Sequence, residues 1–334
     1  MEAFFYAVIL GTFIKLNSIK MKIKNSILKL NLLALITFLT TRTDAQINAE
    51  HYKIYNVKQA REVSVNEMVA DFKNVDVVFF GEEHNDSVAH YLEQNIFELF
   101  FAAFNSNLSL SLEMFDRDVQ PIMNEYLSGA IREKNFLKDA RVWSNYRDYK
   151  PMIEFAKQQK LDVICANAAG RYSNLAGRKG QQALKDLPKE SHPNFAPLPY
   201  DTASGKYYEK LVALTAHDPS AVSDTAKKVV PKMTMGAFNL IMAQSLWDAT
   251  MAYSIADYLK KHKTKKVFQV NGRFHSDEGF AIVTQLLKYS PRTKVLIIST
   301  SKDEAFPVID WSQYKNLGDY VIITDPKIPK TFKD

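Results

Sequence analysis

The sequence predicts an α/β fold with a mainly parallel central sheet flanked by helices, and with a helical lid-like insertion. Short apolar runs alternate with helix-length segments, which is typical of βαβ units. The first run, Val75 to Phe80, ends at Gly81 and leads directly into ionisable residues. A proline-rich stretch at about 184–233 interrupts the pattern and exceeds the usual loop length. We interpret this stretch as the insertion, and a surface excursion over the core is the alternative.

The first half of the domain supplies three of the expected strands and the helices between them. In chain order we expect a helix at 64–73, a strand at 75–80, a helix at 87–104, a strand at 108–114, helices at 117–127 and 131–140, an aromatic loop at 143–151, a helix at 151–160 and a strand at 162–166. The second strand alternates leucine with polar residues. Pro151 suits the first turn of a helix.

The second half continues the same alternation after the insertion. In chain order we expect a helix at 233–261, a strand at 266–270, a helix at 278–289 and strands at 294–299 and 319–324. In an open parallel α/β sheet, ligands bind along the edge formed by the carboxyl ends of the strands. The residues that follow each strand are therefore the first candidates for a functional site.

The composition is that of a globular protein, with 46% hydrophobic and 24% charged residues. The formal net charge is +6, but the first 45 residues hold six Lys/Arg and two Asp/Glu. The remainder has 37 basic and 35 acidic residues, a charge of only +2. We therefore do not expect binding to nucleic acid. Cys165 is the single cysteine, so no intramolecular disulfide is expected.

The first 45 residues predict export. Two lysines shortly after Met21 precede an apolar stretch, 30–39, that is too short to span a bilayer. Small residues then lead to a cleavage position after Ala45. We therefore predict a true start at Met21, an over-extended segment before it, and a single mature domain at 46–334 in the periplasm or cell envelope. An uncleaved anchor is the alternative.

Polar side chains follow four of the expected strands, at positions that would meet along one sheet edge. Two strand ends share the spacing Gly-x-x-His, at 81–84 and at 272–275. Glycine allows the backbone to turn sharply away from the sheet at these points. The other two strand ends supply Glu113 and Asn167.

These side chains suit two kinds of chemistry. Together, His84, Glu113 and His275 can hold a divalent metal with open positions for water. Without a metal, histidines and carboxylates such as Glu82 and Glu83 can act as acid and base. A single histidine after a strand is more often a capping or hydrogen-bonding group. The repeated spacing favours a shared site instead.

Further residues are expected to line the same pocket. Gln244 and Asp248 are four apart on the long helix and share a face, so Asp248 is a candidate partner for a histidine. Arg117 and Gln120 could bind an anionic group, or they could be ordinary residues of a first helical turn. The aromatic loop and the third strand add Trp143, Tyr146 and Asn167.

Six motifs occur in a fixed order: GEEH with a following His90, EMFDRDVQP, a tryptophan-to-YKP loop, CANA, AQSLWDATMA and NGRFH. In this order, over roughly 75–289, the chain resembles the ChaN-like haem-binding uptake proteins of the Tiki/TraB superfamily. The resemblance implies an α/β fold with a lid-like helical region, export to the cell envelope and a role in iron or haem acquisition. Family members are often lipoproteins, but no cysteine lies near the expected cleavage position, which favours a free periplasmic protein.

The resemblance also implies haem as the cofactor, held by tyrosine in a pocket between two protomers, and hence a homodimer. Tyrosine is a sound ligand for ferric haem. The ligand belongs to the variable part of the family, so Tyr207 and Tyr208 are our candidates, and packing within the lid is the alternative for each. An outer-membrane haem or iron receptor is the protein partner that such a role implies.

The superfamily offers a second class of function. Tiki-like relatives use two Gly-x-x-His turns and a glutamate as a metal-dependent hydrolase site, and the erythromycin-esterase-like group uses similarly placed Glu and His. The matching residues here are His84, Glu113 and His275, with Glu82, Glu83 or Glu113 as the general base. We favour a haem-binding protein of iron uptake, and a metal-dependent peptidase or esterase is the alternative.

Overall fold

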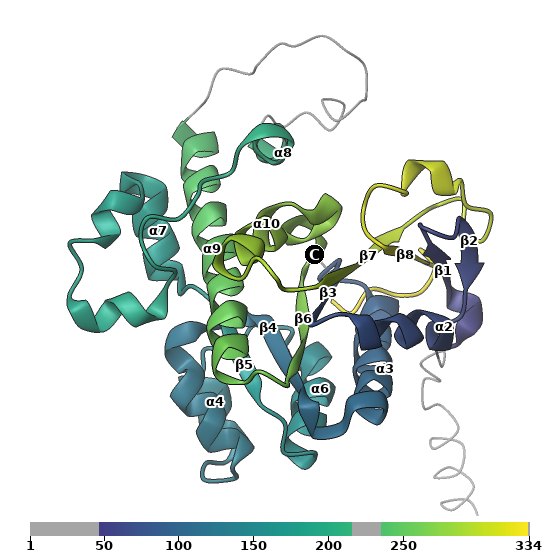
Figure 1. Cartoon of the computed structure of the whole chain (residues 1–334), viewed down its shortest axis with the longest axis horizontal. Helices are drawn as coiled ribbons and strands as arrows, with labels where there is room; N and C mark the ends of the chain where they lie inside the picture. Colours follow the sequence, from purple (N-terminus) through teal and green to yellow (C-terminus); the bar gives the residue numbers. More distant parts are fainter. Residues whose placement is uncertain (1–46, 216–234, 333–334) are drawn as a thin grey trace, which may run out of the picture. The chain divides into compact units, whose positions relative to one another are not determined.

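The computed structural model of the chain describes residues 47–215 and 235–332 (Figure 1). The expected export segment at 1–45 and the last part of the insertion, 216–233, lie outside the described residues. Within the described part, none of the helices combines the length and the apolar character of a membrane span.

Eight strands form one sheet in the order β2-β1-β8-β7-β3-β6-β4-β5. They are β1 Tyr52–Asn56, β2 Arg61–Val63, β3 Val77–Glu82, β4 Leu108–Asp116, β5 Val163–Asn167, β6 Lys266–Gly272, β7 Val295–Lys302 and β8 Tyr320–Thr324. Strands β3 to β8 pair in parallel, whereas β1 pairs antiparallel with β2 and β8. The predicted mainly parallel α/β sheet is thereby confirmed. The two antiparallel strands were not predicted, because they are short and only partly apolar.

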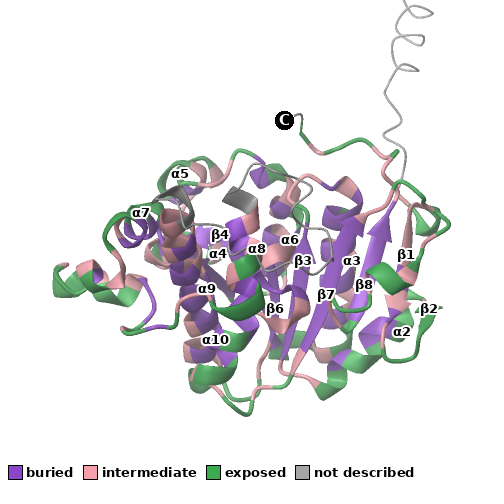
Figure 2. Cartoon of the chain, turned by 90° about the horizontal axis from the view of Figure 1, so that it is seen from above, coloured by how far each residue is buried: buried purple, intermediate pink, exposed green. Residues whose placement is uncertain are grey.

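Helices cover both faces of this sheet (Figure 2). They are α2 Val65–Ala70, α3 Ser87–Phe104, α4 Gln120–Leu127, α5 Glu133–Asp139, α6 Tyr146–Gln158, α7 Gly170–Lys179, α8 Gly205–Thr215, α9 Met235–Lys261 and α10 Ala281–Tyr289. One face packs against α3 and α6, and the other against α9 and α10. The predicted helix start at Pro151 was wrong, because α6 begins at Tyr146 with Pro151 inside it, and α7 was not predicted. Proline removes one backbone hydrogen bond from α6. The burial of Tyr149 and Met152 on either side of Pro151 offsets this loss.

Packing on both faces explains why β4 does not keep one polar face in solvent. Ser109 and Ser111 are fully buried although they alternate with leucine. On the α3 face, Phe97 and Phe100 lie against Phe268 of β6, with ring centroids 5.7 and 6.4 Å apart. The alternation in the sequence therefore marked two buried faces of different polarity rather than one buried and one exposed face.

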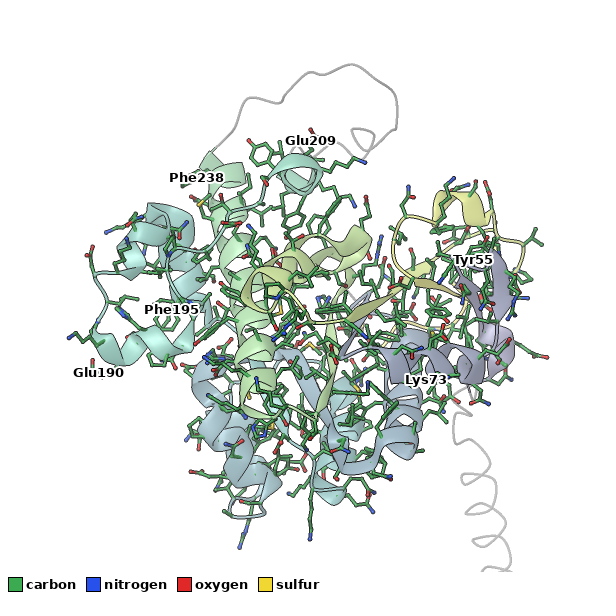
Figure 3. All side chains as sticks on the ribbon, viewed as in Figure 1. Tyr55, Lys73, Glu190, Phe195, Glu209 and Phe238 are labelled. Atoms are coloured by element: carbon green, nitrogen blue, oxygen red, sulfur yellow. The ribbon has the colours of Figure 1, made fainter. Side chains whose placement is uncertain are left out.

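The described part of the insertion packs on the core. Phe195, labelled in Figure 3, is buried against Tyr172 of α7 with ring centroids 5.1 Å apart. Helix α8 packs against α9 through Leu211 and Ile241, both buried in one apolar cluster. These contacts place α8 beside the first half of α9, next to the Arg273–His275 turn that follows β6.

A substitution at Gly81 tests how tightly the end of β3 is packed against the turn after β6. A Cβ atom at this position would lie 2.8 Å from Cα of Arg273 and 2.9 Å from Oγ of Ser276. Because the nearest atom belongs to the backbone, Gly81→Ala should lower the free energy of unfolding by about 1–3 kcal/mol, as measured by urea denaturation. Gly170→Ala is the control, since nothing lies within 4 Å of its Cβ position. Equal stabilities of the two variants would contradict the close packing.

Candidate functional site

Three side chains meet around Gly272 at the carboxyl ends of β3, β4 and β6. The Gly272 amide donates a hydrogen bond to Oε2 of Glu113 at 2.7 Å, and Nε2 of His275 lies 3.5 Å from Oε1 of the same carboxylate. A Cβ atom at Gly272 would lie 2.7 Å from Nε2 of His84 and 3.7 Å from Oε2 of Glu113. The structure therefore brings the two predicted histidines and the predicted glutamate together around Gly272.

The strand register explains this meeting. In the parallel pair of β3 and β6, Gly81 lies opposite Asn271 and Glu82 lies opposite Gly272. The two Gly-x-x-His turns consequently leave the sheet side by side. Gly272 has an ordinary backbone conformation, with φ −53° and ψ 129°, so its missing side chain matters for space rather than for backbone freedom.

Two buried polar side chains, one after the other, orient His275 through hydrogen bonds. Its Nδ1 lies 2.6 Å from Oδ1 of Asp248, and the Tyr207 hydroxyl donates to the other Asp248 oxygen at 2.7 Å. Burial disfavours the charged imidazole, but Glu113 and Asp248 raise the pKa of His275 well above its usual value. In turn, although burial acts the other way, His275 and His84 hold the pKa of Glu113 below its usual value. The expected contact between Asp248 and a histidine is present.

The carboxylate of Glu82 contacts both the partly exposed His84 and buried side chains of the core. Its Oε1 accepts a hydrogen bond from the Tyr149 hydroxyl at 2.6 Å and lies 2.7 Å from Nδ1 of His84. Its Oε2 lies 3.0 Å from Nε2 of His90. Burial alone would raise the pKa of Glu82, but the contacts with His84 and His90 lower it below its usual value.

His84 is the accessible member of the group, since 40% of its side chain is exposed. Partial burial opposes protonation, but Glu82 and Glu113 raise the pKa of His84 above its usual value. The Trp143 ring stands edge-on to the imidazole, with centroids 5.3 Å apart. Glu83 points elsewhere: it is exposed and pairs with Nε of Arg273 at 3.1 Å.

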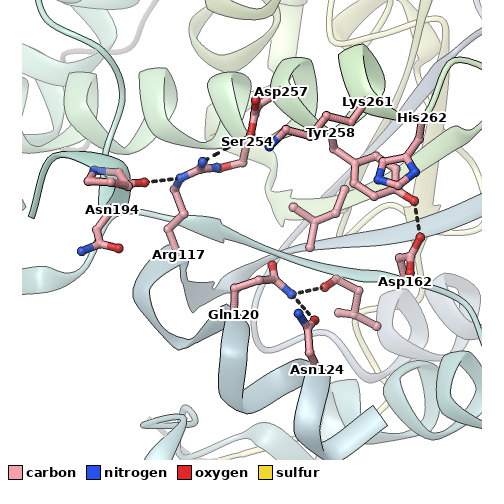
Figure 4. Close-up of a pocket in the computed structure, with 13 residues that line it drawn as sticks. Arg117, Gln120, Asn124, Asp162, Asn194, Ser254, Asp257, Tyr258, Lys261 and His262 are labelled. Carbon is pink, nitrogen blue, oxygen red and sulfur yellow. Dashed lines mark hydrogen bonds and ion pairs between the residues drawn. The ribbon is translucent and has the colours of Figure 1, made fainter. Parts of the chain in front are cut away.

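Several predicted pocket residues lie away from the histidines. Arg117 and Gln120 line a separate cavity of about 470 Å³ between α4, α9 and β5 (Figure 4). Arg117 donates to the Pro193 carbonyl at 2.7 Å and to Oγ of Ser254 at 2.8 Å. The Gln120 amide donates to the Val163 carbonyl and accepts from the Cys165 amide, both at 2.8 Å, so it covers the outer edge of β5.

The remaining predicted residues are buried or half-buried parts of the scaffold. Tyr146 packs against Phe136 with ring centroids 6.0 Å apart. Asn167 accepts a hydrogen bond from the amide of the next residue at 2.8 Å, and Gln244 is half-buried one turn before Asp248 on α9. The sequence interpretation gave no role to Tyr149, Glu93 or Asp148, which surround Glu82 and His90. The spacing of three between His90 and Glu93 on one helix was the available signal.

A family model described as "Haem-binding uptake, Tiki superfamily, ChaN" matches residues 68–286. The chain belongs to this family. The matched range contains all the histidines and carboxylates of the site described above. The resemblance drawn from the six motifs is therefore confirmed.

Three solved structures are similar to this ChaN-family chain, and the first of them shares its fold. ChaN of Campylobacter jejuni, solved with cofacial haem, has a TM-score of 0.62 at 16% identity, covering 83% of this chain and 98% of that one. The type III effector HopBA1 has a TM-score of 0.41 at 13% identity, covering 78% and 92%. A Bacillus cereus protein has a TM-score of 0.42 at 10% identity, covering 79% and 92%. Among the curated proteins, none matches this chain.

Gly272→Ala should displace His84 from its partners. The added methyl group would occupy the space of the imidazole, which can rotate toward solvent because it is partly exposed. The pKa of His84 should then fall toward the unperturbed value of about 6.5. Because the pKa of His84 is raised in the folded protein, protonation of His84 stabilises the fold fully below the unfolded-state pKa, and this stabilisation is lost as the pH rises through the folded-state pKa. In Gly272→Ala this pH-dependent contribution to the free energy of unfolding should be smaller. NMR titration of the imidazole measures the shift, and an unchanged pKa would contradict the geometry.

Proposed function

We propose that this ChaN-family chain is an exported haem-binding protein of haem and iron acquisition. The observation that carries the proposal is the family match over residues 68–286. The Campylobacter relative was solved with haem bound cofacially, and we extend haem as a ligand to this chain. A homodimer and an outer-membrane haem or iron receptor as partner belong to the same proposal.

The surface between α8 and α9 suits a haem group. A cluster of buried side chains that includes Leu211 and Ile241 lies there. Half-buried side chains with large apolar or aromatic groups pack against this cluster: Tyr208, Leu240, Met242, Phe274 and Phe280. A neighbouring cavity of about 300 Å³ is lined by Lys206 and by Lys288, which pairs with Asp201 of the same lining. The exposed Lys206 suits a carboxylate of haem, so apolar contact, an oxygen ligand and a basic group are present within this region.

Of the two candidate ligands, we favour Tyr208. The Tyr207 hydroxyl is already bonded to Asp248 and buried. Burial and the Asp248 charge both raise the pKa of Tyr207 well above its usual value, which disfavours the phenolate that binds ferric iron. Tyr208 lies on the same helix, half-buried at the rim of the apolar cluster.

A haemin titration followed by absorbance tests the ligand. The unmodified protein should give a saturable Soret shift. Tyr208→Phe should bind roughly tenfold more weakly or worse, a loss of at least about 1.4 kcal/mol. Tyr207→Phe is the matched control on the same helix and should retain the iron–phenolate absorption. Equal behaviour of both variants would reject Tyr208 as the ligand, and a missing shift in the unmodified protein would reject haem binding.

Export rests on the sequence of residues 21–45. N-terminal sequencing of the protein purified from the periplasm of a Gram-negative host tests it directly. A first residue of Gln46 is the expected result. A protein that stays in the cytoplasm with Met1 or Met21 at its start would remove export from the proposal.

Metal-dependent hydrolysis at the Gly272 cluster is the second candidate. The meeting of His84, Glu113 and His275 provides two imidazoles and a carboxylate, a donor set that suits a catalytic divalent ion with open positions. An ester or peptide assay with added Zn²⁺ distinguishes the two functions. Turnover that disappears in Glu113→Gln would favour the hydrolase, whereas metal-independent background in both proteins would remove it.

A further inference from the structure

A second group of ligand-type side chains lies beneath the GEEH turn. It consists of Glu82 at the end of β3 with His90 and Glu93 of α3, and all three are buried. We propose that these residues form a buried site for one divalent transition-metal ion of the Zn²⁺ or Mn²⁺ type. The proposal does not depend on the function proposed above.

The geometry suits a single ion. One ligand atom from each residue can be chosen so that all lie within 4.8 Å of one another. Oε2 of Glu82 and Nε2 of His90 are 3.0 Å apart. A metal with ligands at about 2.0–2.2 Å requires ligand atoms roughly 3–3.6 Å apart, so only small side-chain movements are needed. Two carboxylate oxygens and one imidazole nitrogen suit first-row divalent ions.

The polar atoms of this cluster lack the partners that buried groups normally have. Among the described residues, both carboxylate oxygens of Glu93 have no hydrogen-bond partner. Oε2 of Glu82 and the ring nitrogens of His90 also lack a bond of hydrogen-bond geometry, although Oε2 of Glu82 lies 3.0 Å from Nε2 of His90. The Glu93 side chain is 0% exposed and the His90 side chain 5%. Buried polar groups without partners cost folding free energy. A bound cation would give each of the three residues a partner at once.

The surrounding structure aims the ligands at one another. His90 and Glu93 are three residues apart and share one face of α3. The Asp86 side chain caps this helix by accepting from the Val88 amide at 2.9 Å, which fixes where that face begins. The Tyr149 hydroxyl occupies Oε1 of Glu82 and leaves Oε2 for the ion.

Asp148 is positioned to orient His90. Its Oδ2 lies 3.9 Å from Nδ1 of the imidazole, on the side away from Glu82. A carboxylate behind a metal-bound histidine commonly fixes the ring orientation and raises the basicity of the ligand. The competing occupant of the cluster is a proton shared between Glu82 and Glu93, which would satisfy the two carboxyl groups but not the imidazole.

The test uses metal-free full-length protein titrated with ZnCl₂ in a calorimeter, followed by elemental analysis after gel filtration. The unmodified protein should retain one Zn²⁺ per chain. Glu93→Gln, which keeps the shape of the side chain, should retain none, and Asp148→Asn should bind about 10–100-fold more weakly. Glu98→Gln on the same helix is the matched control and should bind as the unmodified protein does. Thermal melts without metal verify that each variant is folded.

The double variant Glu113→Gln/His275→Ala separates this site from the cluster around Gly272 and leaves the contact between His84 and Glu82 intact. It should still bind one Zn²⁺. Loss of the metal in this variant, with retention in Glu93→Gln, would assign the ion to the Gly272 cluster and overturn the proposal. Absence of binding by the unmodified protein would also overturn it and favour the shared proton.

Discussion

The buried carboxylate of Glu82 is the interaction on which the rest of the site depends. A charged group with no exposed surface is stable only when donors surround it. Tyr149 of α6, His84 of the turn and His90 of α3 supply those contacts. The same carboxylate therefore connects the central strand to two helices on one face of the sheet. It also sets the direction in which the accessible imidazole of His84 points.

Glycine and strand register complete the arrangement. Because β3 and β6 are parallel neighbours with Glu82 opposite Gly272, the two Gly-x-x-His turns leave the sheet side by side. A side chain at Gly272 would fill the space between His84 and Glu113. On the other side, Asp248 and Tyr207 tie His275 to α9 and α8. The insertion is thus linked to the sheet edge through a continuous chain of buried hydrogen bonds.

Much of this arrangement could be predicted from the sequence. Apolar runs ending in Gly-x-x-His indicated the strands and the shared edge, and the predicted bounds of α3 agree with the structure. Local patterns could not show that Arg117 and Gln120 face a different cavity, because that depends on how the edge strand β5 meets α4. Nor could they show that the Tyr207 hydroxyl binds Asp248, since those residues are 41 positions apart. The helix start at Tyr146 was missed because Pro151 is normally a signal for a first turn.

The family is described as haem-binding, and we propose the surface between α8 and α9 as the place where haem binds to this chain. A crystal structure of the haemin complex tests this claim most directly. The account predicts haem against Phe274 and Phe280, with iron bonded to the Tyr208 oxygen. Haem seated in the cavity lined by Arg117, or bonded to His84 at the sheet edge, would contradict it.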